Sequence, residues 1–385
     1  MTLSAADELP VHQTAEVIRH VATSDRNFYD RYYFCAFPTD GTAMVVLGMG
    51  VYPNLGVHDA FACVHAAGRQ SVVRASRPLV DRTDLTVGPI RIEVLEPLHR
   101  LRFTCDGADH GVAVDLTWTG AGPAFEEERH QWRSHGRLMI DTMRFAQTGR
   151  WEGWVEVGGE RLTAEPDTWW GTRDRSWGVR PLGEDEPAGI HGLGLVAEGF
   201  MWNYAPMQFA DHTLLYMCQE RSNGDRDLQS AVKVWHDPTK ARERLGRPEH
   251  HHRLDPGTRH ATTSTLAFPE APGGGFEVAV ETLHPAFLQV GTGYGRDPSW
   301  RHGMYQGPEL VVQGVERADD DIDGIERFLV DSSARFTYTD PATGAAHEGY
   351  GLHEWGFFGP FPRYGLRDLL DGASDPLDGA VAEDG

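Results

Sequence analysis

The apolar residues of this chain recur with a period of two, and this spacing restricts the fold more than any other feature of the sequence. Between residues 98 and 118, two runs each place their apolar side chains on one face: Leu101, Phe103 and Cys105, then Val112, Val114, Leu116 and Trp118. Such alternation indicates half-buried β-strands. Residues 106–111 between the runs predict a hairpin loop.

Similar runs continue along the chain and predict a mostly β protein. A second hairpin is expected at residues 151–163, where Gly158-Gly159 allows the positive φ angles of a tight turn. Further strands are predicted at residues 213–219, 231–235, 262–268, 276–282, 325–339 and 347–355. Helix is expected only at residues 11–22 and in a short turn near 364–370. Because helices and strands do not alternate along the chain, the sequence does not predict a βαβ fold.

A chain of 385 residues is long enough for two separate hydrophobic cores. Short strands spread evenly over this length predict two barrels or sandwiches, at residues 23–182 and 188–366. The link between them is expected at residues 183–189, because this stretch, GEDEPAG, is the most polar and breaker-rich in mid-chain. Residues 371–385 are acidic and poor in large apolar side chains, which predicts a disordered tail.

The formal net charge of −22 argues against a nucleic-acid partner, because the chain would repel phosphate backbones. The richest basic run, residues 240–247 followed by 250–253, lacks interleaved aromatics and is interpreted as a solvated loop. No apolar run is long enough for a membrane helix, and residues 1–10 lack the basic and apolar regions of a secretory signal. We therefore expect a cytoplasmic protein without a membrane span, whose four cysteines are buried free thiols.

The segment from residue 167 to 180, DTWWGTRDRSWGVR, combines three tryptophans with five charges. Indoles make broad apolar walls, so the segment predicts a pocket for a large apolar molecule, with Trp170 and Trp177 as substrate-binding residues. Asp174 is the candidate general acid, because burial among aromatics would raise its pKa, whereas the arginines on either side would lower it. Arg173 is its candidate catalytic partner. The alternative is a structural ion-pair lattice of residues 173–175 that fixes the strand end.

Aromatic and histidine side chains beyond the predicted link could line the same cavity. Tyr204 is a candidate for orienting the proton donor, and Trp202 lies two residues away on the same predicted strand face. The alternative is that both are core aromatics. The remaining predicted substrate-binding residues are His191, His212, Tyr216 and His353. Because His353 and Glu354 are adjacent on a predicted strand, only one of them can face a given cavity.

Metal and nucleotide motifs are incomplete. The HxH at residues 250–252 lies in a charged stretch, and the calcium-loop pattern that begins at Asp319 has Val330 in place of the bidentate Glu. Residues 319–324 are therefore interpreted as an acidic hairpin turn. Neither the glycines of GTGYG nor those of GMGVYPN precede a helix, and no GxSxG or P-loop occurs. We expect no bound metal and no cofactor.

The motif WWGTRDRSWG resembles an element of the carotenoid 1,2-hydratase and AttH-like superfamily, which also includes tocopherol cyclase and fungal Diels-Alderases. Gly171, Asp174, Trp177 and Gly178 match this element, whereas the residue pair before Asp174 replaces its usual aromatic residue. The segments YPN at residues 52–54 and GYGLHE at 349–354 further resemble uncharacterised actinobacterial-type members, so that the resemblance covers most of residues 27–364.

This resemblance implies two tandem lipocalin-like (calycin) antiparallel β-barrels with few short helices. It also implies cofactor-independent chemistry on a terpenoid, sterol or polyketide-like substrate, by a lyase or isomerase of the hydratase, cyclase or isomerase type. Acid catalysis of this kind needs a proton donor, here Asp174, and aromatic faces that stabilise a developing cation, here Trp170, Trp177 and Trp202.

Two other classes of function stay open on the sequence. A carrier that binds a hydrophobic small molecule without reaction would use the same pocket. A metal-dependent enzyme is a third hypothesis, raised by the 19 histidines. The oligomeric state is open, with a homodimer as one option.

Overall fold

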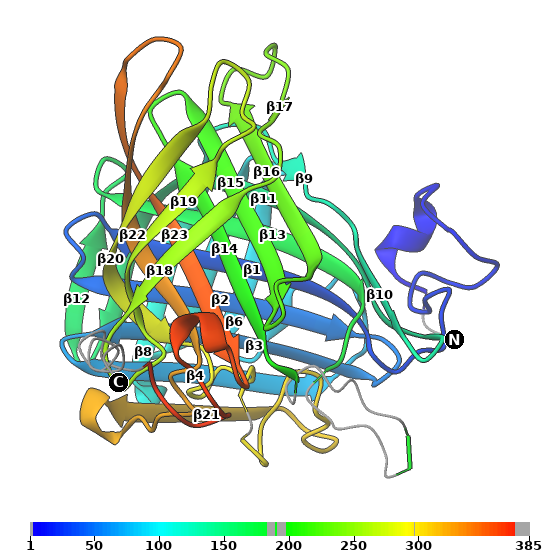
Figure 1. The fold of residues 1–385 in the computed structure, drawn as a ribbon. Coiled ribbons are helices and arrows are strands. Elements are labelled where there is room, and N and C mark those ends of the chain that lie inside the picture. Colours follow the sequence, from blue (N-terminus) through cyan, green and yellow to red (C-terminus); the bar gives the residue numbers. More distant parts are fainter. Residues whose placement is uncertain (1–2, 183–188, 191–197, 296, 374–385) are drawn as a thin grey trace.

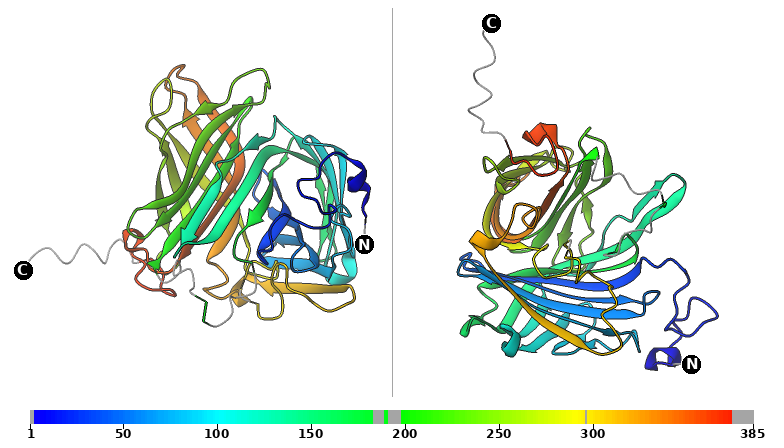
Figure 2. Two further views of the ribbon diagram at one scale, coloured as in Figure 1. Left: turned by 90° about the vertical axis from the view of Figure 1, so that its right-hand side faces the viewer. Right: turned by 90° about the horizontal axis from the view of Figure 1, so that it is seen from below.

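Two curved antiparallel β-sheets make up most of the structure (Figure 1). The computed structural model describes residues 3–182, 189–190, 198–295 and 297–373. Each sheet wraps around its own core, and the two sheets lie side by side (Figure 2). The prediction of a mostly β fold with two tandem antiparallel barrels is confirmed.

The first sheet has 14 strands. They are β1 (Phe28–Pro38), β2 (Ala43–Tyr52), β3 (Val57–Ala66), β4 (Arg69–Pro78), β5 (Thr86–Val87), β6 (Ile90–Glu96), β7 (Arg100–Gly107), β8 (Val112–Gly120), β9 (Phe125–Glu126), β10 (His130–Ser134), β11 (Arg137–Val157), β12 (Glu160–Ala164), β13 (Trp169–Val179) and β21 (Val311–Ala318). Strand β13 lies between β1 and β11, so the segment that contains Asp174 runs along the middle of this sheet.

The second sheet has nine strands. They are β14 (Phe200–Gln208), β15 (His212–Arg221), β16 (Arg226–Trp235), β17 (Glu243–Arg244), β18 (Glu249–Leu254), β19 (Ala261–Phe268), β20 (Phe276–Phe287), β22 (Leu329–Thr339) and β23 (Ala346–Phe358). Strand β23 lies between β14 and β22. Short 3-10 helices also occur, namely η1 (Ala5–Glu8), η2 (Ala108–His110), η3 (Asp319–Asp321) and η4 (Pro362–Tyr364). Within the described ranges, no helix has the length and apolar character needed to cross a membrane.

Both predicted hairpins are confirmed. Strands β7 and β8 pair around η2, and Gly111 adopts a left-handed φ of 98° there. Strands β11 and β12 pair from Val157 and Glu160 outward, and the two glycines between them, Gly158 and Gly159, have φ angles of 60° and 83°. Successive positive φ angles favour glycine because it has no Cβ, so a tight turn forms where the sequence indicated. The strands predicted between residues 213 and 355 lie within β15, β16, β19, β20, β22 and β23, apart from residues 325–328, which precede β22.

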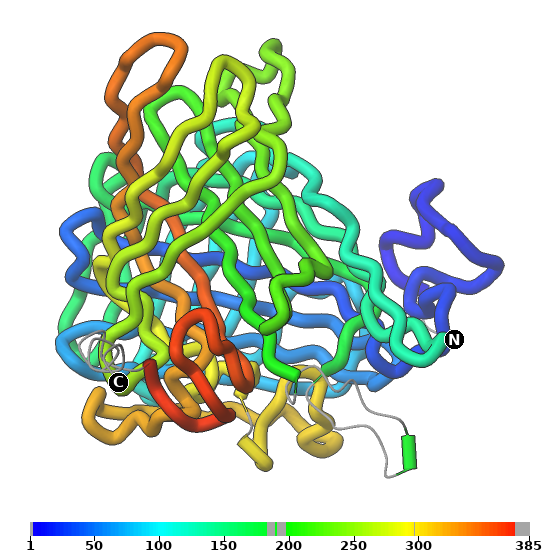
Figure 3. The backbone as a smooth tube through the Cα atoms, viewed as in Figure 1, coloured from blue at the N-terminus to red at the C-terminus, as the bar shows by residue number. Residues whose placement is uncertain are grey.

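The predicted helix at residues 11–22 is wrong. This stretch runs as an irregular chain beside the first sheet (Figure 3). Its backbone bonds to side chains instead of to a helical turn: the Ile18 N–H donates to the Asp7 carboxylate (2.8 Å), and the Ile18 carbonyl accepts from Arg82 (2.7 Å). All its apolar side chains remain at least partly exposed. Tertiary packing, which stabilises most helices in proteins, is therefore weak here.

Two loop interpretations are also wrong. Residues 249–254 form β18 instead of part of a solvated loop, and its alternate residues His250 and His252 are buried. The acidic residues 319–324 do not make a hairpin turn, because they connect β21 to β22, which belong to different sheets. Strand β21 pairs along its whole length with β4, and so extends the edge of the first sheet with a segment from the second half of the chain (Figure 1).

The predicted link at residues 183–189 lies almost entirely outside the described residues, as do residues 374–385 of the predicted tail. Residues 371–373 contact the second barrel: Ala373 forms a parallel bridge with Pro256, and Asp371 pairs with the Arg259 guanidinium (3.2 Å). The division of the chain at residues 23–182 and 188–366 stays a prediction.

Apolar side chains fill both barrels and the contact between them. The first barrel is packed around Trp118 and Trp151, whose ring centroids lie 5.1 Å apart. The core of the second barrel includes the buried rings of Phe209, Phe268 and Phe336. A further cluster, which includes Tyr33 and Leu352, contains residues from both sheets and lies where they meet. We call this contact region the seam.

Gln70 of β4 joins the first sheet to residues at the end of β20. Its fully buried side chain donates to the carbonyls of Phe287 (2.9 Å) and Val290 (3.1 Å) and accepts from the Phe287 N–H (2.8 Å). Gln70→Met would leave these backbone groups without partners, so we expect the free energy of unfolding to fall by about 1–3 kcal/mol. Urea titration measures this against Gln131→Met at an exposed position of β10. Equal losses in the two variants would contradict the expectation.

Candidate functional site

The Trp-rich segment forms β13, and its side chains alternate between two environments. Trp169 and Arg173 face the interior of the first barrel, where Trp169 joins the core and Arg173 makes a buried hydrogen bond of 2.7 Å. Trp170 and Asp174 face the second sheet, where the Trp170 ring meets the Tyr350 ring at 5.2 Å. The strand therefore separates residues that are adjacent in the sequence.

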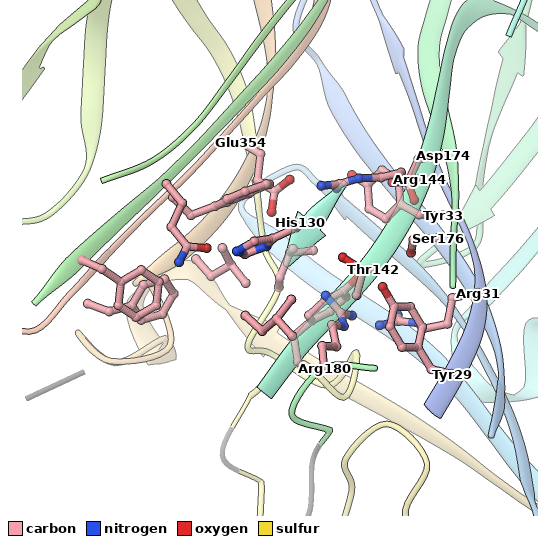
Figure 4. Close-up of a pocket in the computed structure, with 18 residues that line it drawn as sticks. Tyr29, Arg31, Tyr33, His130, Thr142, Arg144, Asp174, Ser176, Arg180 and Glu354 are labelled. Carbon is pink, nitrogen blue, oxygen red and sulfur yellow. The ribbon is translucent and has the colours of Figure 1, made fainter. Parts of the chain in front are cut away.

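A cavity of about 240 Å³ lies in the seam beside Asp174, and we call it the seam pocket (Figure 4). It is lined by the polar residues Tyr29, Arg31, Tyr33, His130, Thr142, Arg144, Asp174, Ser176, Arg180, Gln219, Tyr294 and Glu354, and by the apolar residues Ile140, Phe200, Trp202, Leu288, Leu329 and Phe358. The first half of the chain supplies most of the polar groups, and the second half supplies most of the apolar ones. A ligand held here would meet a charged wall and an apolar wall at once.

Asp174 is a buried carboxyl that faces the seam pocket without a partner. Only 8% of the residue is exposed. Among the described residues its side chain makes no hydrogen bond or ion pair. Burial raises its pKa to about 6, a shift that Arg144 opposes and Glu127 reinforces. A carboxyl with this pKa is partly protonated near neutral pH, so it can donate a proton to a ligand and take one back.

Two further carboxyls lie on the second sheet. Glu354 of β23 and Asp331 of β22 stand directly opposite each other in register. The Tyr33 hydroxyl donates to Asp331, and the Trp202 indole N–H donates to Glu354. Burial raises the pKa of both carboxyls; the charge of Glu354 adds to the shift of Asp331, and that of Asp174 adds to the shift of Glu354. Because like charges this close oppose each other's ionisation, the group retains protons toward neutral pH.

Arg144 of β11 supplies the positive charge at this end of the pocket (Figure 4). Its Nε pairs at 2.7 Å with Glu127, a residue only 5% exposed, whose carboxylate also accepts from the Tyr204 hydroxyl (2.7 Å). The guanidinium carbon lies 5.4 Å from the ring centroid of Trp202 and 5.0 Å from that of Tyr204. The charge of Arg144 lowers the pKa of both carboxyls that line the pocket and so limits the effect of burial.

The raised pKa of Asp174 predicts how its contribution to stability changes with pH. Its ordinary pKa is 3.8, whereas in the folded protein the pKa is about 6. Between these values the unfolded chain loses this proton first, so the contribution of Asp174 to the free energy of unfolding falls as the pH rises through this window. Asp174→Asn should therefore gain stability relative to the native protein between about pH 4 and pH 7. Melting curves of the two proteins test this, since other titrating groups largely cancel in the difference. A constant difference would contradict the raised pKa.

The opposite end of the seam pocket is cationic. Figure 4 shows Arg31, Tyr29 and Arg180 gathered away from Asp174 and Glu354. The Arg180 guanidinium carbon lies 4.7 Å from the centroid of the Tyr29 ring. One end of the pocket thus combines two carboxyls with the Arg144 guanidinium, whereas the other end has two arginines and no carboxyl. The charges of Arg31 and Arg180 still act on Asp174, whose pKa they lower.

The structure brings only some of the predicted site residues together. Asp174 and Trp202 line the seam pocket, and Tyr204 lies behind Trp202, stacked on its ring at 6.0 Å. Arg173 and Trp177 are on the other face of β13, and Trp177 is 36% exposed. Trp170 packs in the seam but is not part of the pocket lining.

The other predicted substrate-binding residues do not line the seam pocket or lie outside the described residues. His191 is outside the described residues. His212, Tyr216 and His353 are fully buried, and each bonds to a side chain of the second barrel at 2.6 to 3.0 Å. None of these three lines the seam pocket. Of the adjacent pair on β23, Glu354 faces this pocket and His353 points away from it.

One buried group of the described residues has metal-ligand chemistry: Cys218, Glu220 and His250 offer ligand atoms within 4.8 Å of one another. Glu220 is already paired with the guanidinium groups of Arg226 (2.9 Å) and Arg363 (3.4 Å). Burial raises the pKa of Cys218 to about 11, which disfavours the thiolate that binds metals. With two positive charges beside it, this group fits an ion-pair cluster better than a metal centre.

Several residues that shape the charge of the pocket were not predicted from the sequence. They are Arg31, Tyr33, Glu127, Arg144 and Asp331. One signal was present in β1, where Arg31 alternates with two tyrosines on a face that is otherwise apolar. A charge at such a position is rarely buried without a reason.

Solved structures with a similar fold include kievitone hydratase from Nectria haematococca and CghA. Kievitone hydratase aligns with a TM-score of 0.51 at 13% identity, over 85% of this chain and 88% of that one. CghA aligns with a TM-score of 0.51 at 11% identity, over 86% and 88%. A putative AttH protein from Nitrosomonas europaea aligns with a TM-score of 0.49 at 12% identity, over 92% and 97%. The first two likenesses show a shared fold, in agreement with the superfamily resemblance of the sequence at that level.

No curated protein sequence matches the chain significantly. The profile of one family, described as a family of unknown function and designated DUF8625, matches residues 3–367. This match spans both sheets and every residue that lines the seam pocket. The chain therefore belongs to the family DUF8625.

Proposed function

We propose that the protein is a cofactor-independent acid catalyst, a hydratase, cyclase or isomerase that acts in the seam pocket on a hydrophobic terpenoid, sterol or polyketide-like substrate. The observation that carries the proposal is Asp174, an unpartnered buried carboxyl with a pKa of about 6 beside an apolar wall. Burying a carboxyl without a partner costs stability, so its presence here favours a chemical role over a purely structural one.

In the proposed reaction, protonated Asp174 gives its proton to one carbon of a substrate double bond, and positive charge develops on the neighbouring carbon. The rings of Tyr29, Trp202 and Tyr294 line the pocket and would stabilise that charge. In hydration, the oxygen of a water molecule bonds to the cation, and the proton that this water releases returns to the Asp174 carboxylate. In isomerisation or cyclisation, the cation instead loses a proton from carbon to that carboxylate. Either route leaves the carboxyl group reprotonated.

The fold shared with kievitone hydratase supports the hydratase type, and CghA has been solved with Sch210972 bound. The substrate class rests on the motif resemblance and on the apolar wall of the pocket. We also propose that, within the carotenoid 1,2-hydratase and AttH-like superfamily, this chain is most similar to the uncharacterised actinobacterial-type members. Four buried free cysteines support a cytoplasmic location.

Product analysis tests the proposal. The purified protein is incubated with a panel of terpenoids, sterols and unsaturated polyketide-like ketones, and binding is followed by tryptophan fluorescence, since Trp202 lines the pocket. A hydratase adds the mass of one water to its substrate, whereas a cyclase or isomerase changes retention without a change in mass. A ligand that binds tightly and is recovered unchanged would contradict catalysis and identify a carrier.

A further inference from the structure

Arg31 is a buried arginine without an ion-pair partner among the described residues. It lies on β1, is 3% exposed and lines the seam pocket. Its Nη2 approaches the Nε2 of His302 at 3.1 Å, whereas its Nε and Nη1 make no hydrogen bond in the described part of the chain. A buried guanidinium with two unsatisfied nitrogens is unfavourable unless another group binds them.

The neighbours of Arg31 hold it in place without neutralising it. The centroid of the Tyr294 ring lies 4.8 Å from its guanidinium carbon. Burial lowers the pKa of His302 to about 4, so this imidazole is neutral and can accept from Arg31. The charge of Asp59 raises the pKa of Arg31. The two residues do not form an ion pair, and the Asp59 carboxylate instead accepts from the Tyr52 hydroxyl (3.1 Å) and from a backbone N–H (2.8 Å). Arg31 is therefore held in place, and its Nε and Nη1 can still donate hydrogen bonds to a ligand.

Small residues and a second arginine complete this end of the pocket. On the neighbouring strand β13, Ser176 pairs directly with Arg31, and the next residue on the same face of β13 is Gly178. Arg180 lines the same end, and its Nε has no hydrogen-bond partner among the described residues. Guanidinium groups bind carboxylates and other oxyanions through charge-assisted hydrogen bonds. A cavity with cationic groups at one end and an apolar wall suits an amphipathic anion.

We infer that the seam pocket binds an apolar molecule that carries one anionic oxygen group, a carboxylate or an enolate, and that Arg31 binds this group. The inference rests on the proposed function and names its substrate class. With the anion at Arg31, the apolar part of the substrate extends toward Asp174 and Glu354 at the other end of the pocket (Figure 4). Arg31 is then a binding residue that sets the orientation, and Asp174 is the proton donor.

Two fluorescent probes that differ in one anionic group test the inference: anilinonaphthalene sulfonate and its uncharged counterpart phenylnaphthylamine. We expect Arg31→Met to raise the Kd of the anionic probe by about tenfold or more and to leave the Kd of the neutral probe unchanged. Methionine keeps an apolar side chain of similar length and removes the charge. Arg102→Met is the matched control, because that arginine is partly exposed and paired with Asp115. Equal probe binding by the native protein and Arg31→Met would overturn the inference.

Stability distinguishes binding from a structural role for Arg31. The anionic probe should raise the Tm of the native protein and leave the Tm of Arg31→Met unchanged, whereas the probe would stabilise both proteins equally if Arg31 had only a structural role. Arg31→Lys is the second variant if the first fails to fold: it keeps the charge but lacks the planar fork, so binding of the anionic probe alone should weaken. Unchanged binding of that probe in a folded Arg31→Lys protein would overturn the inference.

Asp174→Asn separates this inference from the proposed function. The substitution removes a carboxyl from the far end of the pocket, so binding of the anionic probe should persist or tighten. If Asp174→Asn loses turnover and Arg31→Met binds the anionic probe as tightly as the native protein does, the anionic substrate class is overturned and acid catalysis by Asp174 is kept. Retained turnover together with Arg31-dependent binding would contradict acid catalysis and support the anion site.

Discussion

Asp174→Asn is expected to reduce the rate of turnover by about 10²- to 10⁴-fold. The amide has nearly the shape of the carboxyl but no acidic proton to donate. Among the described residues, the side chain of Asp174 has no hydrogen bond to lose. The variant should therefore fold, and near neutral pH it should be at least as stable as the native protein because a buried charge is gone. The rate is measured on a substrate identified by product analysis.

The pH dependence of the native rate provides a second readout of the same carboxyl. If the protonated form of Asp174 is the catalyst, the rate should fall as the pH rises through the pKa of about 6. Asp167→Asn is the matched control, because this aspartate belongs to the same segment and is exposed. The control should keep the native rate and pH profile. Full activity of a correctly folded Asp174→Asn protein would remove the acid role.

Glu127→Gln is expected to lower the free energy of unfolding by about 3–5 kcal/mol. Glutamine can still accept a hydrogen bond from Tyr204, but it leaves the Arg144 guanidinium without its partner at 2.7 Å. Removing one member of a buried ion pair costs more than replacing both, because the remaining charge stays desolvated. Since Glu127 helps to raise the pKa of Asp174, the substitution should also shift the activity profile toward lower pH.

Urea titration measures this loss against Glu126→Gln, the exposed neighbour on β9, which should change stability little. In the double variant Glu127→Gln/Arg144→Met no charge is left unpaired, so much of the stability should return. If the double variant lost the sum of the two single losses, the ion pair would not be the cause.

Local patterns were sufficient to predict both hairpins and about half of the strands, because the period of two and the turn glycines are properties of neighbouring residues. Strand β18 and the pairing partner of β21 show what such patterns miss. In β18 two of the three buried positions are occupied by histidines, so its alternation is not apolar. Strand β21 lies at the edge of the first sheet because it pairs with β4, a partner far away in the sequence. Only the three-dimensional packing determines that choice.

The same distinction explains the site. A carboxylate beside three tryptophans is visible in the sequence, so the place of Asp174 in a pocket lining could be predicted, whereas its role as an acid stays a proposal. Arg144, Glu127 and Asp331 come from other strands, and their meeting depends on sheet register and on how the barrels pack. Arg173 is next to Asp174 in the chain yet faces the first barrel, because adjacent strand residues point to opposite sides.

Incorporation of solvent deuterium tests the central claim most directly. In D₂O the carboxyl of Asp174 exchanges its proton for a deuteron before it reacts, so the product should carry deuterium on carbon, detected by mass spectrometry and NMR. In the same time and at the same protein concentration, Asp174→Asn should form at least about a hundredfold less of this product, whereas Asp167→Asn should form as much as the native protein. Product without carbon-bound deuterium, or equal deuteration by Asp174→Asn, would contradict protonation by Asp174 in the seam pocket.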